Sequence, residues 1–224
     1  MNDLSDLAID VYDNAMFIIA LDYLLEMAPD SPQASRWKSL REGIERNVRA
    51  HLWDVKRQKF IPHIYPEKSP IPEGFDELAI HYHGGTAIAI EAGLLSKDEI
   101  RTVNAQMLEN VRLSGMPSIG LTLYPVYPDG FFHGGMSKAY LYQNGGDWTW
   151  FGGRMIQQLV VNGMVEEAYA EIHPMIERVI QNDGFYEWYG KGGVPSGSGN
   201  FKGSAGVLSK AIELLRDWAE KNKS

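Results

Sequence analysis

One short segment of the chain gathers amide, carboxylate and indole side chains directly before a run with helical spacing. The segment from Tyr142 to Met155 offers six candidate ligand contacts: Tyr142, Gln143, Asn144, Asp147, Trp148 and Trp150. Amides and carboxylates hydrogen-bond to hydroxyl groups, and indole rings stack on flat apolar faces. A simpler interpretation is that Asp147 or Asn144 caps the helix while Trp148 and Trp150 join the core. Because a cap needs only one such residue, we favour a recognition segment.

A second segment, Phe185 to Tyr189, sets the carboxyl group of Glu187 among four aromatic residues, and a glycine-rich run follows. Apolar surroundings raise a carboxyl pKa or direct the group towards a bound ring. Inverting glycosidases use two carboxyl groups roughly 6.5 to 9.5 Å apart, one to protonate the leaving oxygen and one to activate water. Glu187 suits the second role, with Trp188 and Tyr189 as walls. The alternative is an exposed loop glutamate whose aromatic neighbours pack on the scaffold.

Acidic and imidazole side chains also occur together at the start of the third helical run. Asp76, Glu77, His81 and His83 are residue types that bind metal ions. However, His81 and His83 are two positions apart, and on a helix such residues point to different sides. We therefore predict no metal site and expect His83, Asp76 and Glu77 to reach the ligand instead.

The composition excludes several classes of protein. The 224 residues include no cysteine, so disulfides, thiolate catalysis and iron–sulfur clusters are impossible within this chain. The net charge of −8 comes without a cluster of basic residues, and no apolar run reaches the roughly 18 residues of a membrane span. We expect neither nucleic acid nor a membrane as partner. No basic, apolar leader follows Met1, which makes the cytoplasm the default location.

Aromatic residues and glycines are abundant, at 6 Trp, 11 Tyr and 23 Gly, and they crowd into the same connecting segments. This combination favours a neutral, polar ligand with flat apolar faces, such as a sugar. A carbohydrate is therefore the expected partner.

Helical periodicity indicates an all-α domain built from hairpins. Apolar residues recur at helical spacing in seven runs. These runs are 3–27, 31–52, 79–94, 97–112, 149–161, 165–181 and 204–221. Short turns at Pro29, Gly93 and Gly163 join the first six runs into three hairpins, and the seventh run is the first arm of a fourth. The turns at Gly93 and Gly163 also resemble each other, which indicates a repeat of about 70 residues.

The connections between the hairpins are long and rich in Gly, Pro and aromatic residues. They cover residues 53–76, 113–146 and 183–203. Loops of this length are usually functional, and their shared position between hairpins places all three on one rim. We expect the first, third, fifth and seventh runs to form an inner ring that starts at this rim, and the others an outer ring. Gly84, Gly85, Gly152 and Gly153 fit the closer packing of inner helices.

Two stretches resemble a known superfamily. The segment from Gln143 to Arg154, and Glu187-Trp188-Tyr189 followed by the run from Gly197 to Ala205, look like parts of the six-hairpin (α/α)6-toroid glycosidases. The resemblance is to the C-terminal half of that fold. Trehalases and processing α-glucosidases are the most similar in pattern.

The resemblance implies roles for individual residues. Glu187 is the expected catalytic base, and the segment 143–150 is the expected lining of the sugar subsite. In the superfamily the general-acid aspartate lies upstream of the helix that matches 10–27, so Asp147 becomes the fallback acid within this chain. Lys202 stands where the pattern has an aromatic residue.

We therefore predict an all-α, incomplete (α/α) toroid of about three and a half helical hairpins. Residues 1–224 form a single domain that corresponds to the C-terminal half of a larger catalytic domain. The predicted chemistry is inverting hydrolysis of an O-glycosidic bond in an α-glucoside or related oligosaccharide, with no cofactor. One alternative is a non-catalytic sugar-binding or structural half that self-associates or pairs with a missing N-terminal half. A sugar epimerase or a phosphorylase is a further alternative, because related toroids house both.

Overall fold

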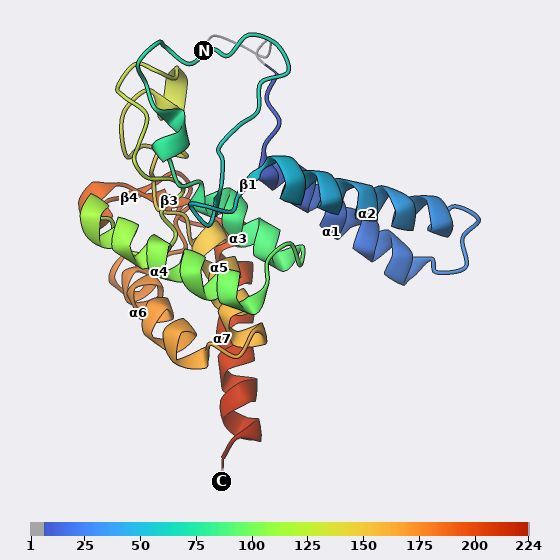
Figure 1. Cartoon of the computed structure of the whole chain (residues 1–224). Coiled ribbons are helices and arrows are strands. Elements are labelled where there is room, and N and C mark those ends of the chain that lie inside the picture. The colour runs from blue at the N-terminus through green and yellow to red at the C-terminus, as the bar shows by residue number, and fades with distance from the viewer. Residues whose placement is uncertain (1–6, 224) are drawn as a thin grey trace.

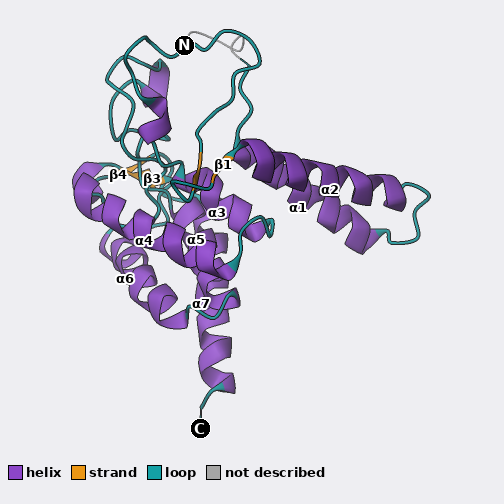
Figure 2. Cartoon of the chain, viewed as in Figure 1, coloured by secondary structure: helices purple, strands orange, loops and turns teal. Residues whose placement is uncertain are grey.

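A computed structural model describes residues 7–223, and helices dominate this part of the chain (Figure 1; Figure 2). The α-helices are α1 Val11–Met27, α2 Ala34–His51, α3 His83–Glu91, α4 Lys97–Ser114, α5 Thr149–Val161, α6 Val165–Gln181 and α7 Lys202–Lys221. The short elements are β1 Trp53–Asp54, β2 Lys59–Phe60, β3 Trp188–Tyr189 and β4 Pro195–Ser196, with 3-10 turns η1 Glu77–Ala79, η2 Gly134–Met136 and η3 Lys191–Gly193. The predicted all-α class is confirmed.

Three helices begin later than the periodicity predicts. The first was expected from residue 3, and residues 3–6 lie outside the described part; α1 begins at Val11 because the Asp10 carboxylate accepts a hydrogen bond from the Asp13 amide at 2.9 Å. The second, α2, was expected from residue 31 and begins at Ala34, after a turn in which the Ala34 amide donates to the Ser31 carbonyl at 2.9 Å. The third was expected from Ala79. His81 instead exchanges two backbone hydrogen bonds with Tyr124, at 2.7 and 3.1 Å, so α3 cannot start before that bridge ends.

The helices form an open double ring, as expected for an incomplete toroid. Inner helices pack in sequence, α1 on α3, α3 on α5 and α5 on α7, while α2 packs on α1 and α6 on α5. Glycines allow the inner helices to approach closely: a Cβ at Gly85 would lie 2.7 Å from Val11 of α1, and one at Gly153 would lie 2.9 Å from Val207 of α7. The expectation of small residues on inner helices is therefore confirmed at these two crossings.

Side-chain bonds connect the outer helices. Arg49 of α2 pairs with Glu99 of α4 at 2.7 Å, and Asn104 of α4 donates to Glu171 of α6 at 2.7 Å. Between the two layers lies a continuous apolar core that includes Ile18, Ile88, Met107, Met155 and Met175. This core fixes the ends of the inner helices relative to one another.

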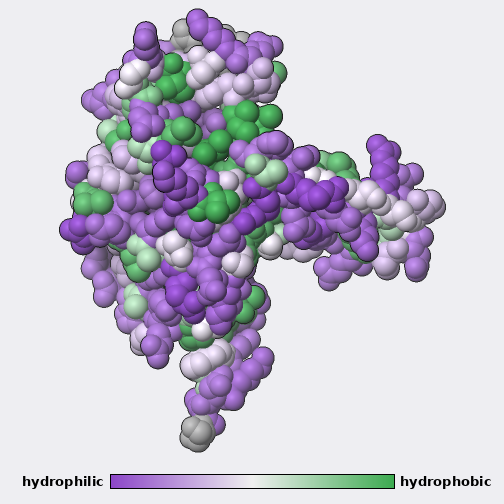
Figure 3. Space-filling model, in the orientation of Figure 1, coloured by the Kyte–Doolittle hydropathy of each residue, from purple (hydrophilic) through white to green (hydrophobic). Residues whose placement is uncertain are grey.

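The far ends of α1 and α2 project from the body, and so does the end of α7 (Figure 1). On the face in Figure 3, the surfaces of α2 and α4 are mainly hydrophilic, as suits helices of an outer layer. Within residues 7–223, no helix is long and apolar enough to cross a membrane.

Candidate active site

The four inner helices begin at one rim, where the three long loops gather (Figure 1). The residues that precede their first turns are Asp10, Tyr82, Trp148 and Phe201. Only Asp10 caps its helix with a side-chain hydrogen bond. The three aromatic residues leave the first amides of α3, α5 and α7 without a side-chain acceptor, so this rim presents rings beside helix N-termini.

An aromatic wall, defined here as Tyr142, Trp148, Trp188 and Phe201, stands at the rim. Ring centroids lie 4.9 Å apart for Tyr142 and Trp148, 6.3 Å for Tyr142 and Trp188, and 6.2 Å for Trp148 and Phe201. Trp148 is buried and donates its indole N–H to the Tyr142 carbonyl at 3.1 Å. Tyr142, Trp188 and Phe201 are only partly buried. These three rings are therefore the ones that can face a ligand.

Trp150 is the second residue of α5 and does not belong to the aromatic wall as defined. Its ring covers the guanidinium of Arg154 at 4.4 Å, and Arg154 also pairs with Glu91 at the end of α3. The half-buried ring also lies against Gly203 at the start of α7. Its contacts are thus those of a helix-packing residue, and its expected role as a sugar contact stays a prediction.

Glu187 sits at the start of a two-stranded hairpin on the rim. Its amide donates to the Ser198 carbonyl at 3.0 Å, and β3 pairs with β4 with Trp188 opposite Ser196. The half-buried carboxyl group packs against Gly197, where any Cβ would overlap it. Gly197 also has a φ of 71°, which favours glycine. The hairpin therefore holds Glu187 in one place, directly before Trp188 of the aromatic wall in the sequence.

Asp147 does not face the rim, so its predicted role as fallback acid does not fit the structure. It is 0% exposed, and Ser118 donates its hydroxyl to both carboxylate oxygens, at 2.7 and 2.9 Å. Arg178 of α6 forms an ion pair with it at 2.7 Å. A carboxylate with these partners has no free side to meet a substrate. The capping part of the simpler interpretation is wrong, because Trp148 and not Asp147 precedes α5. Its other part is confirmed for Trp148, which is buried in the core, with Trp150 partly buried against it.

Asn144 and Tyr189 were expected to contact or wall the ligand, and both are 0% exposed. The Asn144 side chain accepts from the Tyr127 amide at 2.9 Å and donates to the Tyr127 carbonyl at 3.1 Å, as a neighbouring strand would. The Tyr189 ring lies 4.1 Å from the Arg178 guanidinium. Both side chains therefore shape the loops from inside.

A cavity of about 230 Å³ opens at the rim beside α1 and α3. Polar groups that line it belong to Asp10, His63, Tyr65, Tyr82, Tyr127 and Gln143, and apolar ones to Ala8, Pro62, Ile80, Leu123, Phe132 and Met136. Burial raises the pKa of Asp10 above its usual value. Of the predicted contacts only Gln143 lines this cavity. Its mixture of rings and hydrogen-bonding groups suits a polyhydroxylated ligand.

Glu77 anchors the wall of this cavity and does not itself line it. Its carboxylate accepts from His63 Nδ1 at 2.8 Å, from the Tyr65 hydroxyl at 2.8 Å and from the Tyr127 hydroxyl at 2.6 Å. Burial alone would raise the pKa of Glu77, but these hydrogen bonds outweigh it and the net pKa is lowered. The expected direct contact is replaced by a support role. Asp76 is exposed beside it.

His83, the first residue of α3, contacts α4 and does not line the rim cavity. It is buried, its Nε2 bonds to the Asn110 amide at 2.9 Å, and its ring stacks on His81 at 5.7 Å. Burial lowers the pKa of His83 to about 3 and that of His81 to about 4, so both imidazoles are neutral at pH 7. His83 therefore does not reach the rim cavity. Among residues 7–223, no group of three or more His, Asp or Glu side chains is placed to hold a metal ion.

Comparison with known proteins bears on the fold. No family model matches the chain, and neither does any curated protein. A solved GH63 mannosylglycerate hydrolase from Thermus thermophilus, in complex with glucose, is 18% identical, with a TM-score of 0.61 over 94% of this chain and 45% of that one. An uncharacterized conserved protein from the same organism is 18% identical, with a TM-score of 0.63 over 94% and 47%. A sialidase is 12% identical, with a TM-score of 0.61 over 84% and 17%.

The chain shares the helical fold of these solved proteins. It spans less than half the length of the mannosylglycerate hydrolase and of the uncharacterized protein. The resemblance to the six-hairpin glycosidases, and among them to trehalases and processing α-glucosidases, stays a prediction. Because identity is below 20%, the likeness shows the fold alone, and the roles of residues come from the geometry.

Sequence reasoning missed most of the cavity lining. Asp10, His63, Tyr82 and Tyr127 come from four separate parts of the chain. His63 and Tyr127 stood in loops without a motif. Asp10 and Tyr82 lay inside the helical runs expected at 3–27 and 79–94, and only the later starts of α1 and α3 place them at the rim.

Proposed function

We propose that this chain carries the water-activating part of a glycoside hydrolase site, with Glu187 as the base of an inverting cleavage. The proposed substrate is the O-glycosidic bond of an α-glucoside or a related oligosaccharide. The observation that carries this proposal is the placement of Glu187: a glycine-dependent hairpin on the rim holds its carboxyl group against Gly197, directly before Trp188 of the aromatic wall in the sequence. Glucose and mannosylglycerate are ligand and substrate of the solved neighbour, and they support the class of reaction only.

The base in such a reaction takes a proton from water while an acid on the other side protonates the leaving oxygen. Asp147 cannot be that acid, because Arg178 and Ser118 enclose its carboxylate. The superfamily resemblance leaves the acid upstream of α1. Asp10 lines the rim cavity, and we propose that its carboxyl group binds a sugar hydroxyl there.

The test is hydrolysis of α-linked glucose disaccharides and of mannosylglycerate, followed by NMR so that the anomer released first is seen. We expect inversion, and we expect Glu187→Gln to lower kcat by about 10²–10⁴-fold, the usual size of a general-base effect. Glu67→Gln is the control, because Glu67 is exposed on a loop of the same rim. A Glu187→Gln variant with the wild-type rate would remove Glu187 from the mechanism. No hydrolysis by the wild type would overturn activity of this chain on its own.

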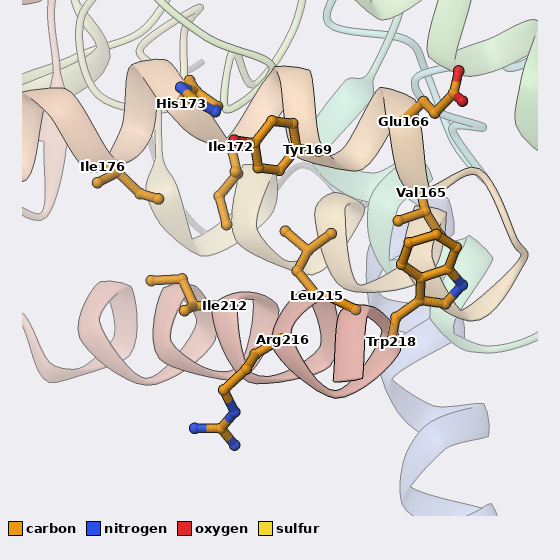
Figure 4. A pocket seen from close by; sticks show the side chains of 11 residues that line it. Val165, Glu166, Tyr169, Ile172, His173, Ile176, Ile212, Leu215, Arg216 and Trp218 are labelled. Atoms are coloured by element: carbon orange, nitrogen blue, oxygen red, sulfur yellow. The ribbon is translucent and has the colours of Figure 1, made fainter. Parts of the chain in front are cut away.

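A second candidate function rests on a different observation, namely that both ends of the open ring are apolar. At one end a groove of about 620 Å³ lies between α6 and α7 (Figure 4). Its side chains are Val165, Glu166, Tyr169, Ile172, His173, Ile176, Ile212, Leu215, Arg216, Trp218 and Ala219. At the other end, Phe17, Leu24 and Met27 of α1 are exposed.

We propose that the remaining helical hairpins of the ring occupy both faces, because the solved chains of this fold are about twice as long as the part matched here. In this candidate the chain is a structural and sugar-binding half that is inactive alone. Sedimentation velocity and binding of an apolar dye test it. A strict monomer that binds no dye would argue against exposed docking faces.

A further inference from the structure

We propose that the buried ion pair between Asp147 and Arg178 positions the strand that presents Glu187, which makes Arg178 of the outer helix α6 a positioning residue for the rim site. The inference deepens the proposed function and rests on it. Arg178 does not touch the rim: it is 5% exposed and reaches inward from the outer layer. Its side chain nonetheless contacts each of the two segments that build the site.

The guanidinium of Arg178 is held on three sides. Nη1 pairs with Asp147 at 2.7 Å, Nη2 donates to the Thr149 hydroxyl at 2.6 Å, and the face of the group lies 4.1 Å from the Tyr189 ring. Thr149 is the first residue of α5, and Tyr189 is the second residue of β3. One side chain therefore fixes the start of an inner helix against the strand that follows Glu187.

Backbone hydrogen bonds also join Asp147 to Tyr189. The Asp147 amide donates to the Tyr189 carbonyl at 2.9 Å, and the Tyr189 amide donates to the Asp147 carbonyl at 2.8 Å. Asp147 is thus tied to Tyr189 through its backbone directly and through its carboxylate by way of Arg178. The position of Glu187, two residues earlier, follows from this double connection.

Residues of the loop before Asp147 also hold its carboxylate in place. Ser118 donates its hydroxyl to the carboxylate, and a Cβ at Gly120 would overlap it. A buried ion pair adds little net stability, since desolvation offsets much of the attraction, but removal of one partner leaves an uncompensated charge. The Asp147–Arg178 pair is therefore suited to fixing the position of Tyr189 relative to the start of α5. This role explains why the pair is buried and does not face the substrate side.

Hydrogen exchange measured by NMR on the full chain tests the inference without relying on hydrolysis. In Arg178→Met, and in the charge-balanced pair Asp147→Asn with Arg178→Met, we expect the Asp147, Tyr189 and Glu187 amides to exchange at least about tenfold faster relative to the Ile88 amide of α3. Arg178→Lys, which keeps the charge and loses the planar fork, should show a smaller rise. Arg41→Met is the control, because Arg41 forms its ion pair with Asp22 far from the rim.

Equal acceleration at Ile88 and at the Tyr189 amide would mean general destabilisation, and it would overturn the positioning role. Unchanged exchange in all variants would overturn it as well. If Arg178→Met does not fold, Arg178→Lys and Thr149→Val provide the same comparison. Where the wild type hydrolyses substrate, Arg178→Lys should lower kcat more than it changes KM. Absence of hydrolysis would count against the proposed function, while the exchange result still decides whether the pair positions the strand.

Discussion

Glu171 is a buried carboxyl group between two outer helices, with too few donors around it. Asn104 donates to its Oε1 at 2.7 Å, whereas Glu171 Oε2 and Asn104 Oδ1 lack a hydrogen-bond partner. Both unpaired atoms are acceptors if the carboxyl is ionised. Burial raises the pKa of Glu171 to about 7, and the hydrogen bond from Asn104 offsets only part of that rise. A proton on Glu171 supplies the donor that this contact lacks.

The raised pKa predicts a pH-dependent stability. Between about pH 4.5 and 7 the folded state keeps a proton on Glu171 that the unfolded state has lost, so the contribution of Glu171 to the free energy of unfolding should fall as pH rises through this window, by on the order of 3 kcal/mol. His81 and His83, whose pKa values are lowered in the folded state, contribute with the opposite sign below about pH 6.5. Urea unfolding at several pH values therefore compares the wild type with Glu171→Gln, which cannot ionise, and the difference between the two should change across the window. The difference between the wild type and Glu166→Gln, exposed on the same helix, should stay constant. A difference between the wild type and Glu171→Gln that does not change with pH would contradict the prediction.

At the scale of elements, the sequence predicts the helices well and the side-chain pairings poorly. Periodicity and turn residues predict each of these helices, because the apolar residues on the buried face of a helix recur at regular spacing within a short stretch of sequence. Asn144 and Asp147 look like ligand contacts in the sequence, yet their partners Tyr127 and Arg178 lie 17 and 31 residues away along the chain. The sequence around Asn144 and Asp147 cannot show that their partners are such distant residues. This is why Glu187 could be placed on the rim while five other candidates are buried, namely His83, Asn144, Asp147, Trp148 and Tyr189.

The β3–β4 hairpin offers a matched pair of glycines for a prediction. Gly192 and Gly197 have φ of 75° and 71°, and only Gly197 faces a side chain, that of Glu187. Gly192→Ala should cost about 1 kcal/mol of stability from backbone strain alone. Gly197→Ala should cost more and also displace Glu187. Urea denaturation and the chemical shift of the Glu187 amide measure both effects. Equal stability losses, with no shift of that amide, would show that Gly197 serves only the turn.

At the scale of the whole molecule, the open ring explains why one chain shows a rim without a complete site. Inner helices α3 and α5 have neighbours on both sides, whereas α1 and α7 have one each. The faces left over are apolar, and solved chains of this fold continue past the matched part. Sequence periodicity gives the number of helices but cannot show which apolar faces stay uncovered, since that depends on how far the ring closes.

The uncovered faces predict where an apolar dye binds. Trp218, 45% exposed, lies in the groove between α6 and α7, and Phe17, 48% exposed, lies on the free side of α1. Trp218→Ser and Phe17→Ser should each reduce dye fluorescence and any concentration-dependent sedimentation, because contiguous apolar surface drives both. Leu113→Ser is the control, since Leu113 is 52% exposed on α4, outside both faces. If Leu113→Ser reduces dye binding as much as the other two variants, the ends of the ring are not special docking faces, and the candidate role as a half that needs a partner fails.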